Sequence, residues 1–217
     1  SPRGSAPVVL KVMRPFVMRQ SARTGNLIVL KETVALGRLN EKVPPTPFVV
    51  RLIETGSSWV SFKNAPLELP WLALEYVHGG SEGTTLHERV HWSVQRTGYA
   101  FDPIRAKHAV ECLAIGLDAI HEVGVVHRDL TPANVLCCGF GREEIFKITD
   151  FGIARPAGTG GFTFGGVPVG TPGYAAPEQV EMNNDLVGNQ SDVFSLAAVT
   201  YRMLTGDDYF PSSSPID

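Results

Sequence analysis

The pattern of the chain changes at the glycine pair Gly79-Gly80, and this change most constrains what the chain can fold into. The part before the pair holds short runs of β-branched and apolar residues that predict strands. These runs are residues 8–13, 48–53 and 71–77. One helix is expected there, over residues 27–39, where apolar residues recur at helical spacing before a proline-rich stretch. The first part is therefore predicted to be a small sheet with one helix.

The part after the glycine pair is predicted to be mainly helical. A long amphipathic pattern covers residues 104–121, and a second helix is expected over 191–205, capped by Ser191 or Asp192 and ended by Gly206. Residues 125–150 predict short strands around a polar loop, and the glycine-rich residues 155–170 are expected to be mobile. The boundary between the two parts is expected within 77–83, and a cleft between two such parts is a usual ligand site.

Charge and cysteine content argue against several classes of protein. The formal net charge of −3 and the pI of about 6.1 give no basis for a nucleic-acid partner. The three cysteines include an adjacent pair, which argues against a disulfide framework, and none has zinc-ligand spacing with a histidine. No apolar run reaches the ~18 residues needed to cross a bilayer, and the first residues do not read as a signal peptide. We expect a cytoplasmic chain with no membrane segment, which is compatible with a parent protein anchored outside this segment.

Two short motifs carry residues that suggest chemistry. Phosphoryl transfer needs a carboxylate to accept the proton of the attacking hydroxyl and an oxygen ligand for Mg²⁺. Asp129 and Asn134, in the sequence HRDLTPAN at 127–134, have the chemistry for these roles. Asp150, in the sequence DFG after an apolar run, could hold a Mg²⁺ that bridges two phosphates. Taken alone, the first motif fits a backbone-capping turn equally well, and the second is better explained as an ordinary strand-ending turn.

Taken together and in this order, the motifs resemble those of the protein kinase family. HRDLTPAN is similar to the catalytic loop of that family, DFG to its metal loop, and GTPGYAAPE at 170–178 to its APE segment. The sequence SDVFSL at 191–196 resembles the next helix, whose Asp192 is expected to brace the HRD turn. The resemblance implies an α+β, bilobal protein-kinase fold. A β-rich N-lobe with one helix is expected over 1–77 and a helical C-lobe over 78–217, both lobes incomplete.

The resemblance also implies roles for the catalytic and phosphate-binding residues. The sequence VVLK at 8–11 is similar to the VAIK strand, so Lys11 is expected to contact the α- and β-phosphates of ATP. Glu32 is expected to hold Lys11 as its ion-pair partner. Asp129 is expected to be the catalytic base, and Asn134 and Asp150 the ligands of Mg²⁺. ATP and Mg²⁺ are thus the implied cofactors.

A second group of residues is expected to bind the adenine. The sequence LALEYV at 72–77 looks like the hinge strand, with Leu74 as the gatekeeper. The backbone of Glu75 and Val77 is expected to bond the base, and Leu136 to pack under it. Val9 stands where the family usually has alanine, and it adds two methyl groups where the base should stack.

The substrate class implied is a protein hydroxyl. Pro132 stands where Ser/Thr kinases have proline, and the APE segment is similar to the Ser/Thr form of bacterial, eukaryotic-like kinases. Partners are then a protein substrate and the kinase itself, by autophosphorylation. Thr163 and, as a lesser candidate, Thr159 are expected to be regulatory phosphorylation sites, with Arg128 as the natural partner of a phosphate there.

Three departures from the family pattern leave a second reading open. The glycine-rich loop and the last helices of the family are not found in this sequence, and Glu178 normally pairs with an arginine in that last part. Thr131 replaces the catalytic-loop lysine, which removes a positive charge near the transferring phosphate, although its hydroxyl could still donate to Asp129. The alternative to an active kinase is therefore a catalytically silent binding or scaffolding module with a kinase fold.

Overall fold

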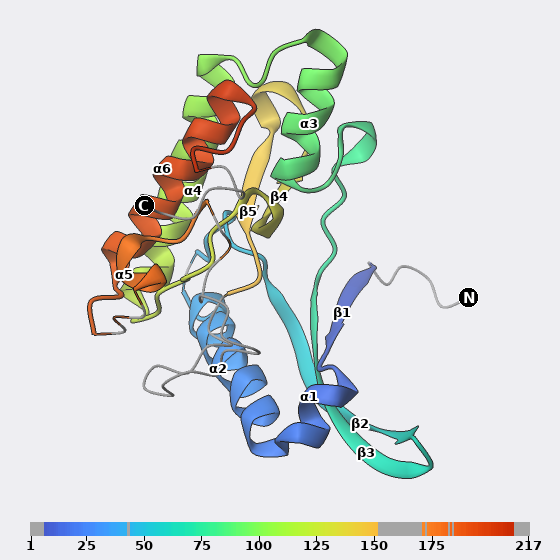
Figure 1. Cartoon of the computed structure of the whole chain (residues 1–217). Coiled ribbons are helices and arrows are strands. Elements are labelled where there is room, and N and C mark those ends of the chain that lie inside the picture. Colours follow the sequence, from blue (N-terminus) through green and yellow to red (C-terminus); the bar gives the residue numbers. More distant parts are fainter. Residues whose placement is uncertain are drawn as a thin grey trace. The chain divides into compact units, whose positions relative to one another are not determined.

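The computed structural model describes residues 7–42, 44–151, 171, 173–181, 183 and 185–210. These residues divide into two compact units. Unit 1 comprises the described residues up to 45 and those from 50 to 76. Unit 2 comprises residues 46–49 and the described residues from 77 onward. Figure 1 shows that the long strands belong to unit 1 and most of the helices to unit 2.

Unit 1 is built on a three-stranded antiparallel sheet with the strand order β1-β3-β2. The strands are β1 (Val8–Val12), β2 (Leu52–Phe62) and β3 (Ala65–Glu75). β2 and β3 form a hairpin whose two turn residues, Lys63 and Asn64, have positive φ angles of 51° and 62°. Two positive φ angles match the right-handed twist of the flanking strands, so this turn favours the hairpin. The long hairpin extends beyond β1 (Figure 1).

Two helices of unit 1 precede β2 in the chain, α1 (Pro15–Gln20) and α2 (Ala22–Asn40). α2 buries apolar side chains that recur at helical spacing, namely Val29, Ala35, Leu36 and Leu39. Glu32 lies among them and is only 4% exposed, which requires a partner for its carboxylate. The helix predicted over 27–39 is confirmed but begins earlier. α1 is too short to show a hydrophobic period, and the sequence did not predict it.

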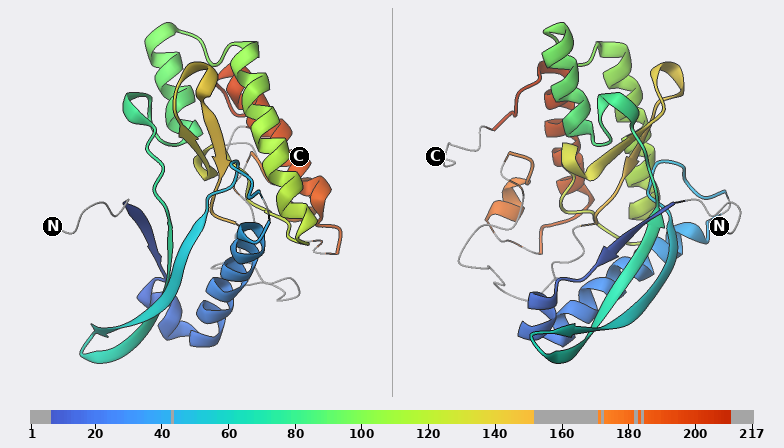
Figure 2. Two further views of the ribbon diagram at one scale, coloured as in Figure 1. Left: turned by 180° about the vertical axis from the view of Figure 1, so that it is seen from behind. Right: turned by 90° about the vertical axis from the view of Figure 1, so that its right-hand side faces the viewer.

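Unit 2 combines helices with a small antiparallel hairpin. The helices are α3 (Leu86–Thr97), α4 (Pro103–Glu122), α5 (Pro177–Val180) and α6 (Asn189–Thr205). The hairpin is β4 (Val135–Cys138) with β5 (Ile145–Ile148), and the 3₁₀ turns are η1 (Gly80–Glu82), η2 (Pro132–Asn134) and η3 (Gly141–Glu143). α4 packs against both β5 and α6 (Figure 2). Within the described part of the chain, no helix is long and apolar enough to span a membrane.

A short segment of unit 2 lies between two segments of unit 1 in the sequence. The Phe48 carbonyl accepts a 2.8 Å hydrogen bond from the Ile148 N–H, and Val49 forms a parallel bridge with Ile148. Gly116 of α4 lies against the same segment, because a Cβ there would come within 2.9 Å of the Phe48 carbonyl oxygen. The strand predicted over 48–53 is therefore wrong. The backbone at 48–49 pairs with β5, and β2 begins only at Leu52.

Two helices of unit 2 differ from the sequence prediction at their N-termini. α3 was missed, although Thr85 and Glu88 form a capping box at its start. α6 begins at Asn189, after Gly188, and so neither Ser191 nor Asp192 is its N-cap. Both side chains are completely buried. Asp192 bonds the turn at 127–128, whereas Ser191, at the third position of the helix, donates to Glu178 and accepts the Gly188 N–H at 3.1 Å. The predicted end of the helix at Gly206, in a left-handed conformation, is confirmed.

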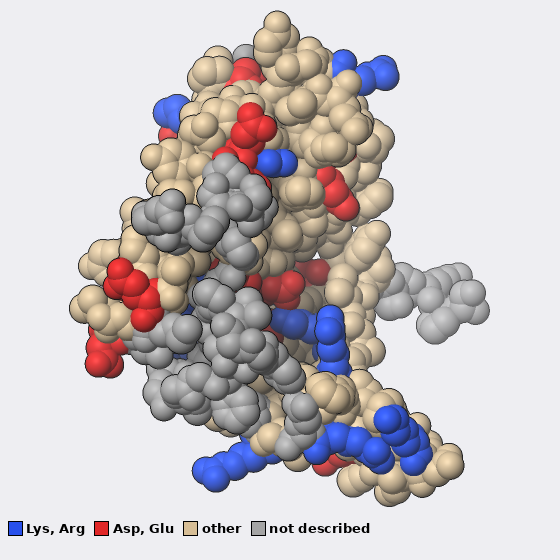
Figure 3. Space-filling view, in the orientation of Figure 1, with Lys and Arg blue, Asp and Glu red and all other residues tan. Residues whose placement is uncertain are grey.

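Charged residues are unevenly distributed over the chain. Lys and Arg gather where α1 and the β2–β3 hairpin lie in Figure 3. Arg19 donates a 3.1 Å hydrogen bond to the Phe62 carbonyl, and Arg19 and Lys63 both lie over the Phe62 ring, 5.2 and 5.9 Å from its centroid. The hairpin tip therefore presents a positive surface that the small negative net charge of the chain does not reveal.

Two helix glycines give opposite predictions for the same substitution. Gly116→Ala places a methyl group against the Phe48 carbonyl, and we expect the free energy of unfolding to fall by about 1–3 kcal/mol. Gly37 of α2 has open space around its Cα, so Gly37→Ala should raise the free energy of unfolding by about 0.5–1 kcal/mol through helix propensity. Denaturant unfolding of both variants checks this. Equal effects at the two positions would contradict the packing of Phe48 on α4.

Candidate active site

A buried carboxylate fixes the turn that begins the sequence HRDLTPAN. Asp192 of α6 accepts hydrogen bonds from the backbone N–H groups of His127 and Arg128, each 2.8 Å long. His121 of α4 adds a third bond of 2.7 Å through its Nε2 atom. Arg128 has a φ of 68°, a strained value for a residue with a side chain, and it lies within this bonded turn. The predicted bracing of the turn by Asp192 is confirmed.

Two side chains hold the Asp129 carboxylate. The Thr171 hydroxyl donates to Oδ1 at 2.9 Å, and the Asn134 amide donates to Oδ2 at 3.3 Å and to the Asp129 carbonyl at 2.8 Å. Thr131 was expected to donate to this carboxylate, and that expectation is wrong. The hydroxyl that donates to Asp129 belongs to Thr171, which the sequence did not single out. Thr131 contributes a backbone bond, in which its carbonyl accepts the Asn134 N–H of η2.

His127 is fully buried and forms hydrogen bonds with both ring nitrogens. Its Nδ1 accepts the Asp129 N–H at 3.3 Å, so Nε2 carries the proton and donates to the Thr149 carbonyl at 3.0 Å. Burial lowers the pKa of His127 and favours this neutral form. The imidazole also packs against the Phe151 ring, with 5.4 Å between centroids. His127 therefore links the loop around Asp129 to the segment that follows β5.

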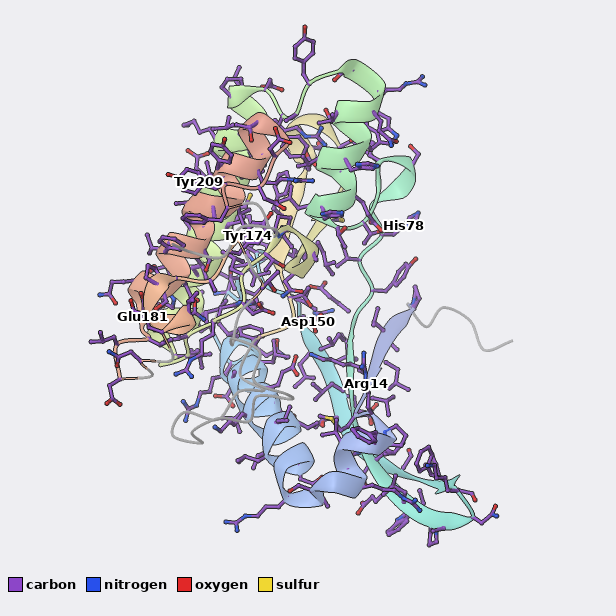
Figure 4. All side chains as sticks on the ribbon, viewed as in Figure 1. Arg14, His78, Asp150, Tyr174, Glu181 and Tyr209 are labelled. Carbon is purple, nitrogen blue, oxygen red and sulfur yellow. The ribbon has the colours of Figure 1, made fainter. Side chains whose placement is uncertain are left out.

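Asp150 lies directly after the segment that His127 holds. The Thr149 N–H donates a 3.0 Å hydrogen bond to the Asn134 carbonyl, which brings the backbone next to Asp150 against Asn134. Asp150 has a φ of 54° and an exposed side chain in the loop after β5, where Figure 4 labels it. Because the Asn134 amide nitrogen is directed at Asp129, the amide oxygen is the atom left to bind a metal. An amide oxygen and a carboxylate are ligands that Mg²⁺ accepts, so the donor set fits this ion.

The described part of the chain contains no larger acidic or thiol cluster that could form a further metal site. Among the described residues, no group of three or more His, Cys, Asp and Glu side chains is placed to hold a metal ion. Gly152, the last residue of DFG, lies outside the described residues, and so do Thr159 and Thr163. The expected phosphorylation sites and their partnership with Arg128 therefore stay predictions.

The predicted ion pair of unit 1 is confirmed. Lys11 of β1 donates to both carboxylate oxygens of Glu32 on α2, at 2.8 and 3.0 Å. The Glu32 side chain is 6% exposed and the Lys11 side chain 39% exposed, so the pair is buried on its acidic side only. The ammonium group is thus held in one place and remains accessible to solvent. A fixed, accessible ammonium is suited to bind phosphate.

The residues expected to bind adenine lie in both units. In unit 1, Val9 is opposite Leu74 in the β1–β3 register, and Leu74 is buried. The Glu75 N–H donates to the Arg51 carbonyl at 2.9 Å, so a contact from the Glu75 backbone to a base has to come from its carbonyl. In unit 2, Val77 is buried and Leu136 of β4 is partly exposed. No contact in the structure tests their predicted roles.

The end of the APE segment is attached to the same loop and to α6. Gln179, which the sequence reasoning did not single out, donates from its amide to the Arg128 carbonyl at 2.7 Å. The Ser191 hydroxyl donates to the Glu178 carboxylate, and the Ser195 hydroxyl donates to the Tyr174 carbonyl at 2.7 Å. Glu178, expected to pair with an arginine farther along the chain, thus has a hydroxyl partner here. The position of Gln179, right after APE, was the sequence signal available for finding it.

Comparisons with known proteins agree with this geometry. The family model described as "Protein kinase domain" matches residues 5–216. The serine/threonine-protein kinase PknB of Mycolicibacterium smegmatis is 35% identical over 175 residues, which cover 78% of this chain and 25% of that protein. The PknB of Mycobacterium tuberculosis H37Rv is 33% identical over 175 residues, with the same coverage. The chain thus spans about a quarter of the length of the curated relatives it matches.

A solved structure shows the same fold. The crystal structure of the Mycobacterium tuberculosis PknI kinase domain superposes with a TM-score of 0.65 at 21% identity, covering 99% of this chain and 70% of that one. The predicted α+β, bilobal protein-kinase fold is therefore confirmed.

Burial of His127 predicts a pH-dependent stability. The unfolded chain takes up a proton on this imidazole near its ordinary pKa of about 6.5, whereas the folded protein resists protonation because its pKa is lower. The free energy of unfolding should therefore fall as the pH drops below about 6.5, by at most about 1.4 kcal/mol per pH unit. Thermal unfolding across pH 5–8 measures this. His127→Gln should flatten the profile, whereas exposed His91→Gln should not, and a profile unchanged by His127→Gln would contradict the assignment.

Proposed function

This chain belongs to the protein kinase domain family, and we propose that it is the catalytic part of a protein Ser/Thr kinase, which transfers the γ-phosphate of Mg-ATP to a protein hydroxyl. The proposal concerns the activity of the whole protein, of whose relatives the chain spans about a quarter. The observation that carries it is the Asp129 carboxylate, held by Thr171 and Asn134 on a turn fixed by Asp192. A carboxylate held in this way, with an open side, is suited to accept a proton.

The proposed mechanism assigns the proton transfer to Asp129. Its partly exposed carboxylate accepts the proton of the acceptor hydroxyl as that oxygen attacks the γ-phosphorus, and the bond from this phosphorus to the bridging oxygen breaks to release ADP. Thr171 and Asn134 keep the two carboxylate oxygens in one orientation, so that the hydroxyl is aligned without reorganisation of the loop. Bound Mg-ATP supplies the phosphoryl group and the metal charge that neutralises it.

In this proposal a fixed ammonium group holds the nucleotide phosphates, and two oxygen ligands hold the metal. Lys11, fixed by Glu32, binds the α- and β-phosphates. The carboxylate of Asp150 and the amide oxygen of Asn134 bind the metal. Protein kinases as a family use ATP with Mg²⁺, which supports these assignments.

The adenine contacts follow the sequence expectation. The Glu75 carbonyl and the Val77 backbone bond the edge of the base, and Leu136 packs against its face. Leu74 limits the depth of the site, and Val9 covers the base from β1. These contacts rest on the family resemblance and on the positions of the residues in β1, β3 and β4.

Substrate, lobe limits and location remain part of the proposal. The acceptor is a serine or threonine of a protein, including this protein itself by autophosphorylation at Thr163 or Thr159. The N-lobe extends over 1–77 and the C-lobe over 78–217. A cytoplasmic location is supported by the three cysteines, all of which have free thiols in the described residues.

Asp129→Asn tests the proposed base. We expect kcat to fall about 10²–10⁴-fold, because the neutral amide cannot accept the proton, while the Kd for ADP changes less than about twofold. Asp118→Asn, at an exposed position of α4, is the matched control and should retain wild-type kcat. Steady-state phosphotransfer and calorimetric titration of the full-length protein supply the two numbers. A wild-type protein that transfers no phosphate would support the silent module, and near wild-type turnover of Asp129→Asn would remove the base from this position.

Thr171 gives a separate test of how the base is held. Thr171→Ala should lower kcat about tenfold, because Asp129 loses the hydroxyl that fixes Oδ1, and Thr171→Ser should retain most of the rate. The Kd for ADP should stay constant in both variants. A kcat of Thr171→Ala equal to that of wild type would show that the bond does not orient Asp129.

A further inference from the structure

A completely buried arginine of α3 lies outside every role assigned above. Arg89 has no exposed surface, and its guanidinium donates to three backbone carbonyls. These are Gly79 at 2.9 Å, Gly83 at 3.1 Å and Gly139 at 3.0 Å. It also pairs with Glu144, whose side chain is equally buried. A buried arginine with this number of bonds to main-chain carbonyls holds backbone segments together.

The segments that Arg89 joins come from two parts of unit 2. Gly79 and Gly83 flank η1 on its two sides, and this loop begins at Gly79, two residues after Val77. Gly139 directly follows β4, the strand that carries Leu136. Figures 1 and 2 show α3 beside the β4–β5 hairpin, with the η1 loop leading into the helix.

Glycine at all three acceptor positions allows this convergence. A Cβ at Gly79 would come within 1.9 Å of the Gly83 carbonyl oxygen, and one at Gly139 within 2.8 Å of the Glu143 carbonyl oxygen. Gly83 and Gly139 also have positive φ angles of 99° and 75°. The loop is thus folded tightly enough that its carbonyls reach one guanidinium. Arg89 also lies over the Phe140 ring, 5.0 Å from its centroid.

Two further contacts connect the loop to β4. The Cys137 N–H donates to the Thr84 carbonyl at 2.7 Å, and Thr85 forms an antiparallel bridge with Leu136. Arg89, Gly79–Thr85 and β4 therefore form one bonded assembly. The assembly contains Leu136 and begins two residues after Val77. Val77 and Leu136 are the residues of unit 2 to which adenine binding is assigned.

We propose that Arg89 is a positioning residue for nucleotide binding: its guanidinium fixes the loop after Val77 against β4 and so sets the spacing between Val77 and Leu136. The proposal rests on the proposed function. When Arg89 is absent, the loop samples other positions, and the apparent Kd rises in inverse proportion to the fraction of molecules that remain competent to bind. Asp129 and Asn134 make no bond to Arg89, so kcat at saturating ATP is unaffected.

The chain provides a matched control in Arg105 of α4. Arg105 bonds the same Glu144 carboxylate, at 2.8 and 2.9 Å, and the Glu82 side chain at 3.0 Å. It donates to none of the three glycine carbonyls. Removing either arginine leaves Glu144 paired with the other, so both variants disturb the ion network without isolating its charge. Only Arg89→Met also removes the three hydrogen bonds to the glycine carbonyls, which form the backbone clamp.

The test compares Arg89→Met and Arg105→Met in the full-length protein by calorimetric titration with adenosine and with ADP and Mg²⁺. For Arg89→Met we expect Kd to rise about tenfold for both ligands, because the clamp acts on the adenine side, and kcat to stay within about twofold. For Arg105→Met we expect Kd to stay within about twofold of wild type, even if its melting temperature falls as far as that of Arg89→Met. Arg89→Lys keeps the charge but cannot reach three carbonyls, so its Kd should rise as well.

The remaining outcomes separate the two proposals. Equal Kd values for Arg89→Met, Arg105→Met and wild type overturn the positioning role. A parallel rise in both variants overturns it too, because the effect then follows the ion network and not the clamp. A wild-type protein that binds neither ligand overturns the proposed function, on which this inference rests. Should Arg89→Met not fold, the double variant Arg89→Met/Glu144→Leu, which leaves no buried charge unpaired, decides by the same Kd comparison.

Discussion

The geometry of the HRD turn in unit 2 depends on the buried carboxylate of Asp192. A carboxylate removed from water is strongly unfavourable unless donors replace the lost hydration. Here two backbone N–H groups of the HRD turn and the His121 imidazole supply those donors, across 64 to 71 positions of sequence. If the turn changed its geometry, the buried Asp192 carboxylate would lose its hydrogen-bond donors. Arg128 consequently keeps its strained φ of 68°, and Asp129 follows it in a fixed direction.

The same helix also fixes the described end of the APE segment. Ser191, Asp192 and Ser195 share one face of α6, because residues three and four apart are neighbours on a helix. Asp192 bonds the HRD turn, while the two serines bond Glu178 and the Tyr174 carbonyl. The helix is itself held by Val199 and Met203, both completely buried. Apolar packing thus orients one rigid element, and its polar face then aligns two segments that are distant in the sequence.

The sequence predicted what local patterns and ordered motifs encode, and it failed where distant contacts decide. The pairing of Lys11 with Glu32 and the bracing of the turn by Asp192 were both predicted correctly, because both followed from the family resemblance. The start of α6 was misplaced because a buried Asp192 looks like an N-cap in the sequence. Thr131 was given the bond to Asp129 because it is near in the sequence. The donor is Thr171, which only the three-dimensional path of the chain brings to the carboxylate.

This exchange of donors changes the electrostatics of the proposed reaction. A lysine in place of Thr131 would bring a cation to the loop, and a unit charge at ~4 Å interacts by roughly 4 kcal/mol at an effective dielectric of ~20, before desolvation is subtracted. Thr171 and Asn134 orient Asp129, but as neutral donors they bring no charge to the phosphate. The loop therefore supplies alignment, and in the proposed function the positive charge near the phosphates is assigned to Lys11 and the metal. A catalytic loop of this kind makes the proposed phosphotransfer depend more heavily on its metal than one that carries its own ammonium.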